Sequence, residues 1–309
     1  MPRDVALLVN PTAGRGRARR LVEPVAARLR DLGCTVRVLA GAGVEQAHGL
    51  ARAEVAAGVE VLAVLGGDGM CHLALQAVAG TRTTLAIVPA GTGNDLCATV
   101  GLPADPIRAA EVIAAGTPTR FDLGRADRPG GDRPGTGETW WGTVLCAGFD
   151  ARVNERANRM RWPRGPRRYD LAVLAELYRL RPRPATVTMD GERWQGDVTL
   201  VAIGNGARYG GGQYICPDAR PDDGLLDVAI VRPLTRRQVV ALKPKLSTGE
   251  LRDHPAVIRR RVSEVRLEIA GLAAYADGER VGPLPVRVRC VPGALRVLVP
   301  TGSRARPTP

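Results

Sequence analysis

Short aliphatic runs alternate with helical patterns over the first 120 residues. Four runs bounded by Gly, Pro or Asn predict buried strands: Val5–Val9, Thr35–Leu39, Val61–Leu65 and Leu85–Val88. The segments between them carry apolar residues near a helical period and predict helices at Arg17–Leu32, Glu45–Ala57 and Cys71–Ala79. This alternation is typical of a parallel sheet with helices on both faces, so we predict an N-terminal three-layer α/β/α domain.

The pattern changes after Phe121-Asp122. Residues 125–139 are rich in Gly, Pro, Asp and Arg and predict a mobile surface loop. A strand at Gly142–Ala147 and an arginine-rich helical stretch to about Leu180 follow. Alternating strands then dominate, with a hairpin turn at Asp190-Gly191: Thr186–Met189, Val198–Ile203, Leu226–Val231, Val265–Ile269, Val286–Cys290 and Leu295–Val299. We predict an α/β chain whose first domain (1–121) is completed by 293–309, followed by a β-rich, sandwich-like domain (122–292).

Charge narrows the possible partners. The net charge is +13, and the chain has 42 arginines but lysine only at Lys243 and Lys245, so anionic partners such as nucleotides, nucleic acid or acidic membranes are favoured. Two Phe, five Tyr and four Trp offer few stacking surfaces, which argues against a single-stranded nucleic-acid platform. The start lacks a signal-peptide pattern, and no apolar stretch approaches the ~18 residues that span a bilayer. Six scattered cysteines without a CxxC pair favour reduced thiols, so we expect a cytoplasmic protein whose membrane contact is peripheral.

Three glycine-rich loops follow predicted strands, at Asn10–Gly16, Gly66–Gly69 and Pro89–Asp95. Small residues let backbone N–H groups approach phosphate oxygens, and helix N-termini favour negative charge. Asp68 and Asp95 are suited to hold the Mg²⁺ that accompanies a nucleotide, directly or through water. Each loop alone is equally consistent with a tight turn or helix cap. Three such loops after strands of one predicted sheet favour a phosphate-binding site. The chain has neither a GxxxxGK[ST] loop nor a GxGxxG fingerprint.

The three loops resemble the catalytic domain of the diacylglycerol kinase family, in its bacterial soluble lipid-kinase branch. Further family motifs follow in order: Gly148-Phe149-Asp150-Ala151, Gly204-Asn205-Gly206, Gly210-Gly211-Gly212, Pro217-Asp218-Ala219, Asp222–Asp227 and Asp277-Gly278-Glu279. The resemblance covers residues 4–300 except 125–139. Sphingosine kinases and, more distantly, NAD kinases and phosphofructokinases share the Gly66–Gly69 element and the two-domain plan.

The resemblance implies ATP-dependent phosphorylation of a lipid hydroxyl in a cleft between the domains, with diacylglycerol as the expected acceptor and phosphatidic acid as the product. It implies that Glu279 is the general base, with Asp277 as the weaker candidate, and that Asp68 positions Mg²⁺ and nucleotide for catalysis. The alternative for Asp277-Gly278-Glu279 is a hairpin turn. The implied nucleotide-site residues are Asn10, Pro11, Thr12, Ala13, Gly14, Gly66, Gly67, Asp68, Gly69, Met70, Cys71, His72, Gly91, Thr92, Asn94 and Asp95.

The resemblance also implies a structural Mg²⁺ on the Asp223 carboxylate, with the backbone carbonyls of Arg220 and Leu225 as co-ligands. A plain Asp-Asp-Gly turn is the alternative. Asp122 is implied to join an acidic network that reaches the nucleotide.

Two departures from the family pattern bear on nucleotide recognition. Members usually carry Thr after the Gly66–Gly69 element, where this chain has Met70-Cys71-His72, and Ala40 replaces a threonine found after the second strand. Both changes remove hydroxyl contacts near the nucleotide.

A basic stretch between residues 152 and 168 indicates a membrane partner. It holds one acid, Glu155, with Trp162 and Tyr169 close by, and seven arginines: Arg152, Arg156, Arg159, Arg161, Arg164, Arg167 and Arg168. It fits an anionic bilayer that presents the lipid substrate. A solvated helix face is the alternative. We expect no nucleic-acid partner, and a homodimer stays open.

Three rival functions remain at this point. The first rival is a kinase whose phosphate acceptor is a sphingosine- or ceramide-type lipid. The second is a kinase whose acceptor is a soluble substrate such as NAD. In the third the chain is a non-catalytic nucleotide-binding or nucleic-acid-binding protein, which the +13 charge suggests. The acidic site residues and the second-domain motifs argue for the lipid kinase.

Overall fold

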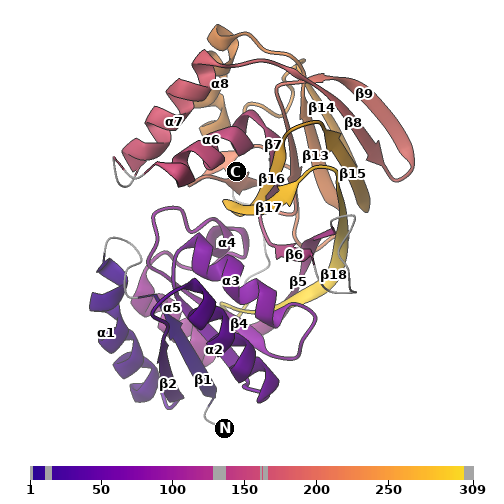
Figure 1. Cartoon of the computed structure of the whole chain (residues 1–309). Coiled ribbons are helices and arrows are strands. Elements are labelled where there is room, and N and C mark those ends of the chain that lie inside the picture. Colours follow the sequence, from indigo (N-terminus) through magenta and orange to yellow (C-terminus); the bar gives the residue numbers. More distant parts are fainter. Residues whose placement is uncertain (1–2, 11–15, 128–136, 161, 163–165, 303–309) are drawn as a thin grey trace. The chain divides into compact units, whose positions relative to one another are not determined.

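The computed structural model describes residues 3–10, 16–127, 137–160, 162 and 166–302. They belong to two compact units, drawn in Figure 1. Unit 1 comprises 1–123, 221–224 and 291–308, and unit 2 comprises 124–220 and 225–290. The sequence division placed residues 221–224 in the second domain. They belong to unit 1, where Asp122 N–H donates to Pro221 O and the Asp122 carboxylate accepts Gly224 N–H.

Unit 1 is built on a parallel sheet with strand order β2-β1-β3-β4-β18. Its elements are β1 (Asp4–Val9), α1 (Arg17–Asp31), β2 (Thr35–Ala40), α2 (Val44–Ala56), β3 (Val61–Gly66), α3 (Asp68–Val78), β4 (Thr84–Pro89), α4 (Asp95–Thr99), α5 (Pro106–Ala115), the start of β5 (Thr117–Asp127) and the end of β18 (Val286–Val299).

Helices cover both faces of this sheet, because α1 packs with α5 and α2 packs with α3. Val5, Leu7 and Val9 of β1 face α1 and α5 in one apolar core. Since successive strand residues point to opposite faces, Ala6 and Leu8 are buried against the other helical layer. Two covered faces explain why the strands have continuous aliphatic runs instead of alternation.

Unit 2 contains two sheets and a helical layer. Its elements are the end of β5, β6 (Glu138–Trp141), β7 (Val144–Gly148), α6 (Phe149–Arg159), α7 (Pro166–Tyr178), β8 (Arg183–Met189), β9 (Glu192–Val198), β10 (Leu200–Gly204), β11 (Arg208–Tyr209), β12 (Gln213–Tyr214), β13 (Leu226–Val231), α8 (Arg236–Thr248), β14 (Val257–Val262), β15 (Glu264–Ile269), β16 (Ala273–Ala276), β17 (Glu279–Pro283) and the start of β18.

One sheet of unit 2 is antiparallel, in the order β14-β13-β10-β7-β16-β17, and it is covered on both faces. In β10, Val201 and Ile203 pack against the second sheet, which includes β8, β15 and the start of β18. Leu200 and Ala202 point the other way, into a core shared with α6, α7 and α8. The predicted α/β fold with a β-rich, sandwich-like second half is confirmed.

Three local predictions were wrong. The expected loop at 125–139 contains strand residues at both ends, because Arg125 to Asp127 of β5 pair with Glu138 to Trp140 of β6. Residues 128–136 lie outside the described part. The runs at 286–290 and 295–299 form one strand, β18. The strand-dominated region contains α8, whose start is stabilised by a capping box between Thr235 and Gln238.

No helix within the described ranges combines the length and apolar character needed to cross a membrane.

Candidate active site

Unit 1 places a glycine-rich loop where open parallel sheets bind ligands. β1 lies between β2 and β3, so the strand order reverses at β1, and the carboxyl ends of β1 and β3 flank this switch point. α3 begins at Asp68, directly after β3, and α4 begins at Asp95, after β4. The N-terminus of the eleven-residue α3 therefore faces the carboxyl edge of the sheet, a position that favours a phosphate group.

Backbone contact between the second and third loops explains two of the glycines. A Cβ on Gly67 would lie 2.9 Å from Gly91 Cα, and a Cβ on Gly91 would lie 2.5 Å from Gly67 Cα. No side chain fits between these backbones. The glycines hold the two loops together and leave the surface of the loops lined by backbone.

The Asp68 carboxylate joins the same two loops. Asn94 N–H donates to Asp68 Oδ2 at 2.9 Å, and Asp95 N–H donates to Asp68 Oδ1 at 2.7 Å. Asn94 has left-handed backbone (φ 55°) and its side chain binds Gly91 at both N–H and C=O. Asp68 thus stabilises the start of α4, a role that the sequence did not reveal.

The predicted nucleotide residues other than Gly66 and Gly69 divide into three groups. The structure brings together Gly67, Asp68, Gly91, Asn94 and Asp95 in one loop cluster. Met70 and Cys71 are buried, His72 is half-buried, and Thr92 is exposed. Asn10 ends the described part of the first loop, and Pro11, Thr12, Ala13 and Gly14 lie outside the described residues.

In unit 2, Asp277 holds the loop that precedes β7. Its Oδ1 accepts Thr143 N–H at 2.9 Å and Thr143 Oγ1–H at 2.6 Å, and its Oδ2 accepts Gly142 N–H at 2.9 Å. Buried Asn205 binds the same loop, since its Nδ2 donates to Gly142 O at 3.0 Å and its N–H donates to Thr143 O at 2.9 Å. Two family motifs therefore converge on Gly142-Thr143, a dipeptide that the sequence motifs do not include.

Glu279 differs from Asp277 in exposure and in hydrogen bonding. Asp277 and Gly278 both have positive φ (51° and 85°) and form the turn between β16 and β17, so the expected hairpin is present. Glu279 opens β17 and is exposed. Within the described part of the chain, its carboxylate has no hydrogen bond or ion pair. It is available to accept a proton, whereas both oxygens of Asp277 are engaged.

Asp122 and the predicted metal ligand Asp223 both lie in unit 1. The buried Asp122 carboxylate accepts Gly224 N–H at 2.7 Å and Gly293 N–H at 2.8 Å, so it connects the 221–224 turn to β18. Asp223 is half-buried in this turn. The residues directly before and after the turn, Arg220 and Leu225, are part of unit 2. No group of three or more His, Cys, Asp or Glu side chains gathers as a metal site among the described residues. The expected site has one carboxylate, so this finding leaves it as a prediction.

A half-buried acid–phenol pair follows β7. The Tyr209 hydroxyl donates to Asp150 Oδ2 in the first turn of α6. Burial raises the pKa of the Asp150 carboxyl above its ordinary value, and the hydrogen bond from Tyr209 opposes this shift. Burial and the neighbouring Asp150 charge raise the pKa of Tyr209 well above its ordinary value, so the phenol stays protonated and donates. The sequence motifs name Asp150 but give no signal for its partner.

Two family models match the chain over both units. The diacylglycerol kinase catalytic domain matches residues 4–126, and the YegS C-terminal NAD kinase beta sandwich-like domain matches residues 143–299. The chain is 42% identical over 298 residues to the "Diacylglycerol kinase" of Mycobacterium tuberculosis strain CDC 1551, a match that covers 96% of this chain and 95% of that protein. The chain belongs to the diacylglycerol kinase family. The resemblance read from the motifs is confirmed, and the protein is a lipid kinase.

Further relatives agree with this family. The chain is 32% identical over 259 residues to the "Probable lipid kinase YegS-like" of Stenotrophomonas maltophilia, which covers 79% of this chain and 80% of that protein. A crystal structure titled as a diacylglycerol kinase from Bacillus anthracis superimposes with a TM-score of 0.73 at 21% identity and covers 97% of both chains. At that identity the structural likeness supports the fold alone.

Proposed function

We propose that this lipid kinase transfers the γ-phosphoryl group of ATP to the hydroxyl of diacylglycerol and releases phosphatidic acid and ADP. The observation that carries the proposal is the contrast within one hairpin between Asp277, whose carboxylate is held by the Gly142-Thr143 loop, and the exposed Glu279. The name of the Mycobacterium tuberculosis relative supports diacylglycerol as the acceptor.

The loop cluster of unit 1 fits a nucleotide phosphate. Gly67 and Gly91 present backbone where any Cβ would collide, and the α3 N-terminus contributes a favourable dipole. In the proposed reaction these loops hold the phosphates. Mg²⁺, when bound, neutralises charge on the transferring phosphoryl group. Because each Asp68 oxygen already accepts a backbone N–H, we infer that Asp68 acts on the nucleotide chiefly by fixing the loops.

Glu279 supplies the proton acceptor in the proposed reaction. As the acceptor oxygen forms its bond to the γ-phosphorus, the bond from phosphorus to the β–γ bridging oxygen breaks, ADP leaves, and the hydroxyl proton passes to the Glu279 carboxylate. An exposed carboxylate is suited to this step because no donor among the described residues competes for its oxygens. Asp277 has a positioning role, since it fixes the turn from which Glu279 projects.

The lipid substrate requires access to a bilayer, and α7 carries the surface that we propose for it. Its buried face includes Ala172 and Glu176, while Leu171, Leu174 and Tyr178 recur at helical spacing on the opposite side. Leu174 is 61% exposed and Tyr178 is 74% exposed. An apolar helix face turned outward among arginines is typical of a surface that binds anionic membranes.

The membrane surface that we propose differs from the basic stretch predicted from the sequence, because some of its arginines are paired with carboxylates. Arg152 and Arg156 form ion pairs with buried Glu176, and Arg159 pairs with Glu155, so these three arginines have carboxylate partners inside unit 2. Arg161 and Arg164 lie outside the described residues. Arg167 is exposed, Arg168 lies over the Tyr169 ring, and Trp162 is 80% exposed. We therefore assign membrane contact to Trp162 and the outer face of α7.

The experiment that tests the function measures phosphate transfer from γ-labelled ATP to micelle-presented diacylglycerol, ceramide and sphingosine, and to soluble NAD. We expect labelled phosphatidic acid from diacylglycerol and at least tenfold less product from the other acceptors. The Glu279→Gln variant serves as the blank. Preferred labelling of ceramide, sphingosine or NAD would contradict the proposed acceptor, and absence of ATP-dependent labelling of every acceptor would contradict the proposed donor.

A further inference from the structure

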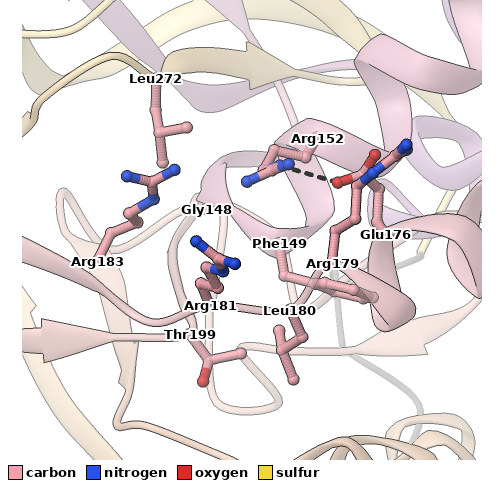
Figure 2. Close-up of a pocket in the computed structure, with 10 residues that line it drawn as sticks. All are labelled: Gly148, Phe149, Arg152, Glu176, Arg179, Leu180, Arg181, Arg183, Thr199 and Leu272. Atoms are coloured by element: carbon pink, nitrogen blue, oxygen red, sulfur yellow. Dashed lines mark hydrogen bonds and ion pairs between the residues drawn. The ribbon is translucent and has the colours of Figure 1, made fainter.

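Unit 2 contains an arginine-lined pocket that the proposed reaction does not use. Its lining comprises Gly148, Phe149, Arg152, Glu176, Arg179, Leu180, Arg181, Arg183, Thr199 and Leu272, around a small space that is partly open to solvent. Figure 2 shows the side chains of Arg152, Arg181 and Arg183 around the opening. Four of the ten lining residues are arginines and Glu176 is the one acid among them.

The sequence Arg179-Leu180-Arg181-Pro182-Arg183-Pro184 explains how three guanidinium groups reach one pocket. α7 ends at Tyr178 and β8 begins at Arg183, so the segment between them leaves the helix and becomes extended. Arg181 and Arg183 each precede a proline, which restricts them to extended backbone. In extended chain, alternate residues point to the same side. Arg181 and Arg183 therefore point to the same side, and Arg179 lines the same pocket from the turn that ends α7.

The fourth arginine is fixed by an ion pair. Arg152 Nε lies 2.8 Å from Glu176 Oε2, and Arg156 binds the other oxygen of the same carboxylate. Two arginines thus neutralise the single buried acid. Arg179, Arg181 and Arg183 have no carboxylate partner in the part of the chain that the structure describes. The pocket therefore has a surplus of positive charge held by forked donors, which match the oxygens of a phosphate group.

The pocket lies at the end of β7 away from the hairpin with the expected base. Gly148, at the carboxyl end of the strand, lines the pocket, and Thr143, before its amino end, binds Asp277. These two positions are five residues apart along the strand, a span of roughly 17 Å. Within unit 2 the arginine pocket is a separate site.

We propose that this pocket binds a phosphate-bearing anion. Arg179, Arg181 and Arg183 supply the donors to the phosphate oxygens. Phe149, Leu180 and Leu272 offer apolar contacts to the organic part of a phosphate ester. A phospholipid headgroup and a soluble phosphate ester share this chemistry, and the test separates them.

The test titrates inorganic phosphate, then glycerol 3-phosphate, into the full chain by calorimetry at constant ionic strength. The variant is Arg181→Gln with Arg183→Gln. The matched control is Arg193→Gln with Arg260→Gln, which removes the same charge from exposed strand positions of unit 2. We expect about tenfold or greater loss of phosphate affinity in the pocket variant, because charge-assisted hydrogen bonds are lost. The control retains the wild-type affinity.

A second arm measures co-sedimentation with vesicles that contain phosphatidate or, at the same lipid charge, phosphatidylserine. Loss of phosphatidate binding in the pocket variant alone identifies a lipid headgroup. Loss of glycerol 3-phosphate binding without a change in sedimentation identifies a soluble ester. Equal phosphate affinity of wild type, pocket variant and control would overturn the proposal. Since both substituted pocket positions are exposed, the fold is expected to persist. Arg181→Gln alone, with an unchanged melting temperature, provides the same comparison.

Discussion

Asp95 donates its backbone N–H to the Asp68 carboxylate at 2.7 Å, across 27 residues of chain. With the neighbouring bond from Asn94, this contact makes Asp68 the link between the loops that follow β3 and β4. From the sequence, Asp68 is expected to act on Mg²⁺ and nucleotide. Its contacts give it a structural role as well, and the two roles have different experimental consequences.

Asp68→Ala should lower both activity and stability. The substitution leaves the partly buried Asn94 and Asp95 N–H groups without their acceptor, and loss of the acceptor of a buried donor costs up to about 1–3 kcal/mol. We expect the free energy of unfolding in urea to fall by about this amount. Thr92→Ala, at an exposed position of the same loop, should stay within about 0.5 kcal/mol of wild type. An Asp68→Ala protein as stable as wild type would show that Asp68 does not hold the loops.

Substitution of Glu279 should lower turnover, whereas substitution of Asp277 should lower the free energy of unfolding. Glu279→Gln removes the proposed base from an exposed position, so turnover should fall by ~10²–10⁴-fold while stability stays unchanged. Asp277→Asn replaces one acceptor of the Gly142-Thr143 loop by a donor, so it should lower the free energy of unfolding by roughly 1–3 kcal/mol. Steady-state kinetics and urea unfolding of both variants check this. Near-normal turnover of Glu279→Gln would remove it from the base role.

A structural Mg²⁺ at Asp223 should raise the melting temperature of the protein. An ion bound only by the folded state stabilises it by RT ln(1 + [L]/Kd). EDTA should therefore lower the melting temperature of the nucleotide-free wild type, and Asp223→Asn should reproduce the loss and abolish the response to EDTA. Asp222→Asn, exposed in the same turn, is the matched control. Identical melting in EDTA and in millimolar Mg²⁺ would favour the plain turn, which the Gly224 bond to Asp122 already stabilises.

The sequence predicted those parts of the fold that are determined locally. Both faces of β3 and β10 are covered, so continuous aliphatic runs mark these strands directly. β9 was missed because its residues are mostly exposed and polar, with only Val198 buried. α8 carries a readable start signal in Thr235-x-x-Gln238, yet flanking strand patterns obscured it.

The candidate site was harder to predict because its contacts join distant residues. Motifs indicate that Asp277 and Asn205 matter, but no local pattern shows that both hold Thr143, 134 residues away from Asp277. The same holds for Asp150 and Tyr209, which are 59 residues apart. The chemistry of a motif can be read from the sequence, whereas its division into positioning and reacting groups depends on tertiary contacts.

Tyr209→Phe should destabilise the protein more at high pH than at low pH. Burial raises the pKa of Asp150, and an acid with a raised folded-state pKa contributes stability that is present below its unfolded pKa and lost as pH rises through the folded one. Removing the Tyr209 donor raises the Asp150 pKa further, so this loss grows. Urea unfolding of wild type and variant at pH 5 and pH 8 measures it. The pairing would be contradicted if the free energy of unfolding lost in the variant were the same at both pH values, or larger at pH 5.

The outer face of α7 should control binding to vesicles. Leu171 and Leu174 are 43% and 61% exposed, so replacing both with Gln should leave the fold intact. Each leucine that enters the membrane interface contributes up to about 1.5–3 kcal/mol, and we expect co-sedimentation with anionic vesicles to fall at least tenfold. Activity on diacylglycerol in those vesicles should fall in parallel, whereas activity on a short-chain, water-dispersed substrate should persist.

The control for this surface is Leu32→Gln with Val44→Gln, which removes two exposed apolar side chains from unit 1. It should sediment like wild type. High salt should weaken wild-type binding as well, because Arg167 and Arg236 near this face attract anionic lipid and salt screens that attraction within roughly 10 Å. Salt and the leucine substitutions should then act independently, since one removes charge attraction and the other removes apolar burial. If the Leu171/Leu174 variant and the unit 1 control sediment equally well, the enzyme meets its lipid through another surface.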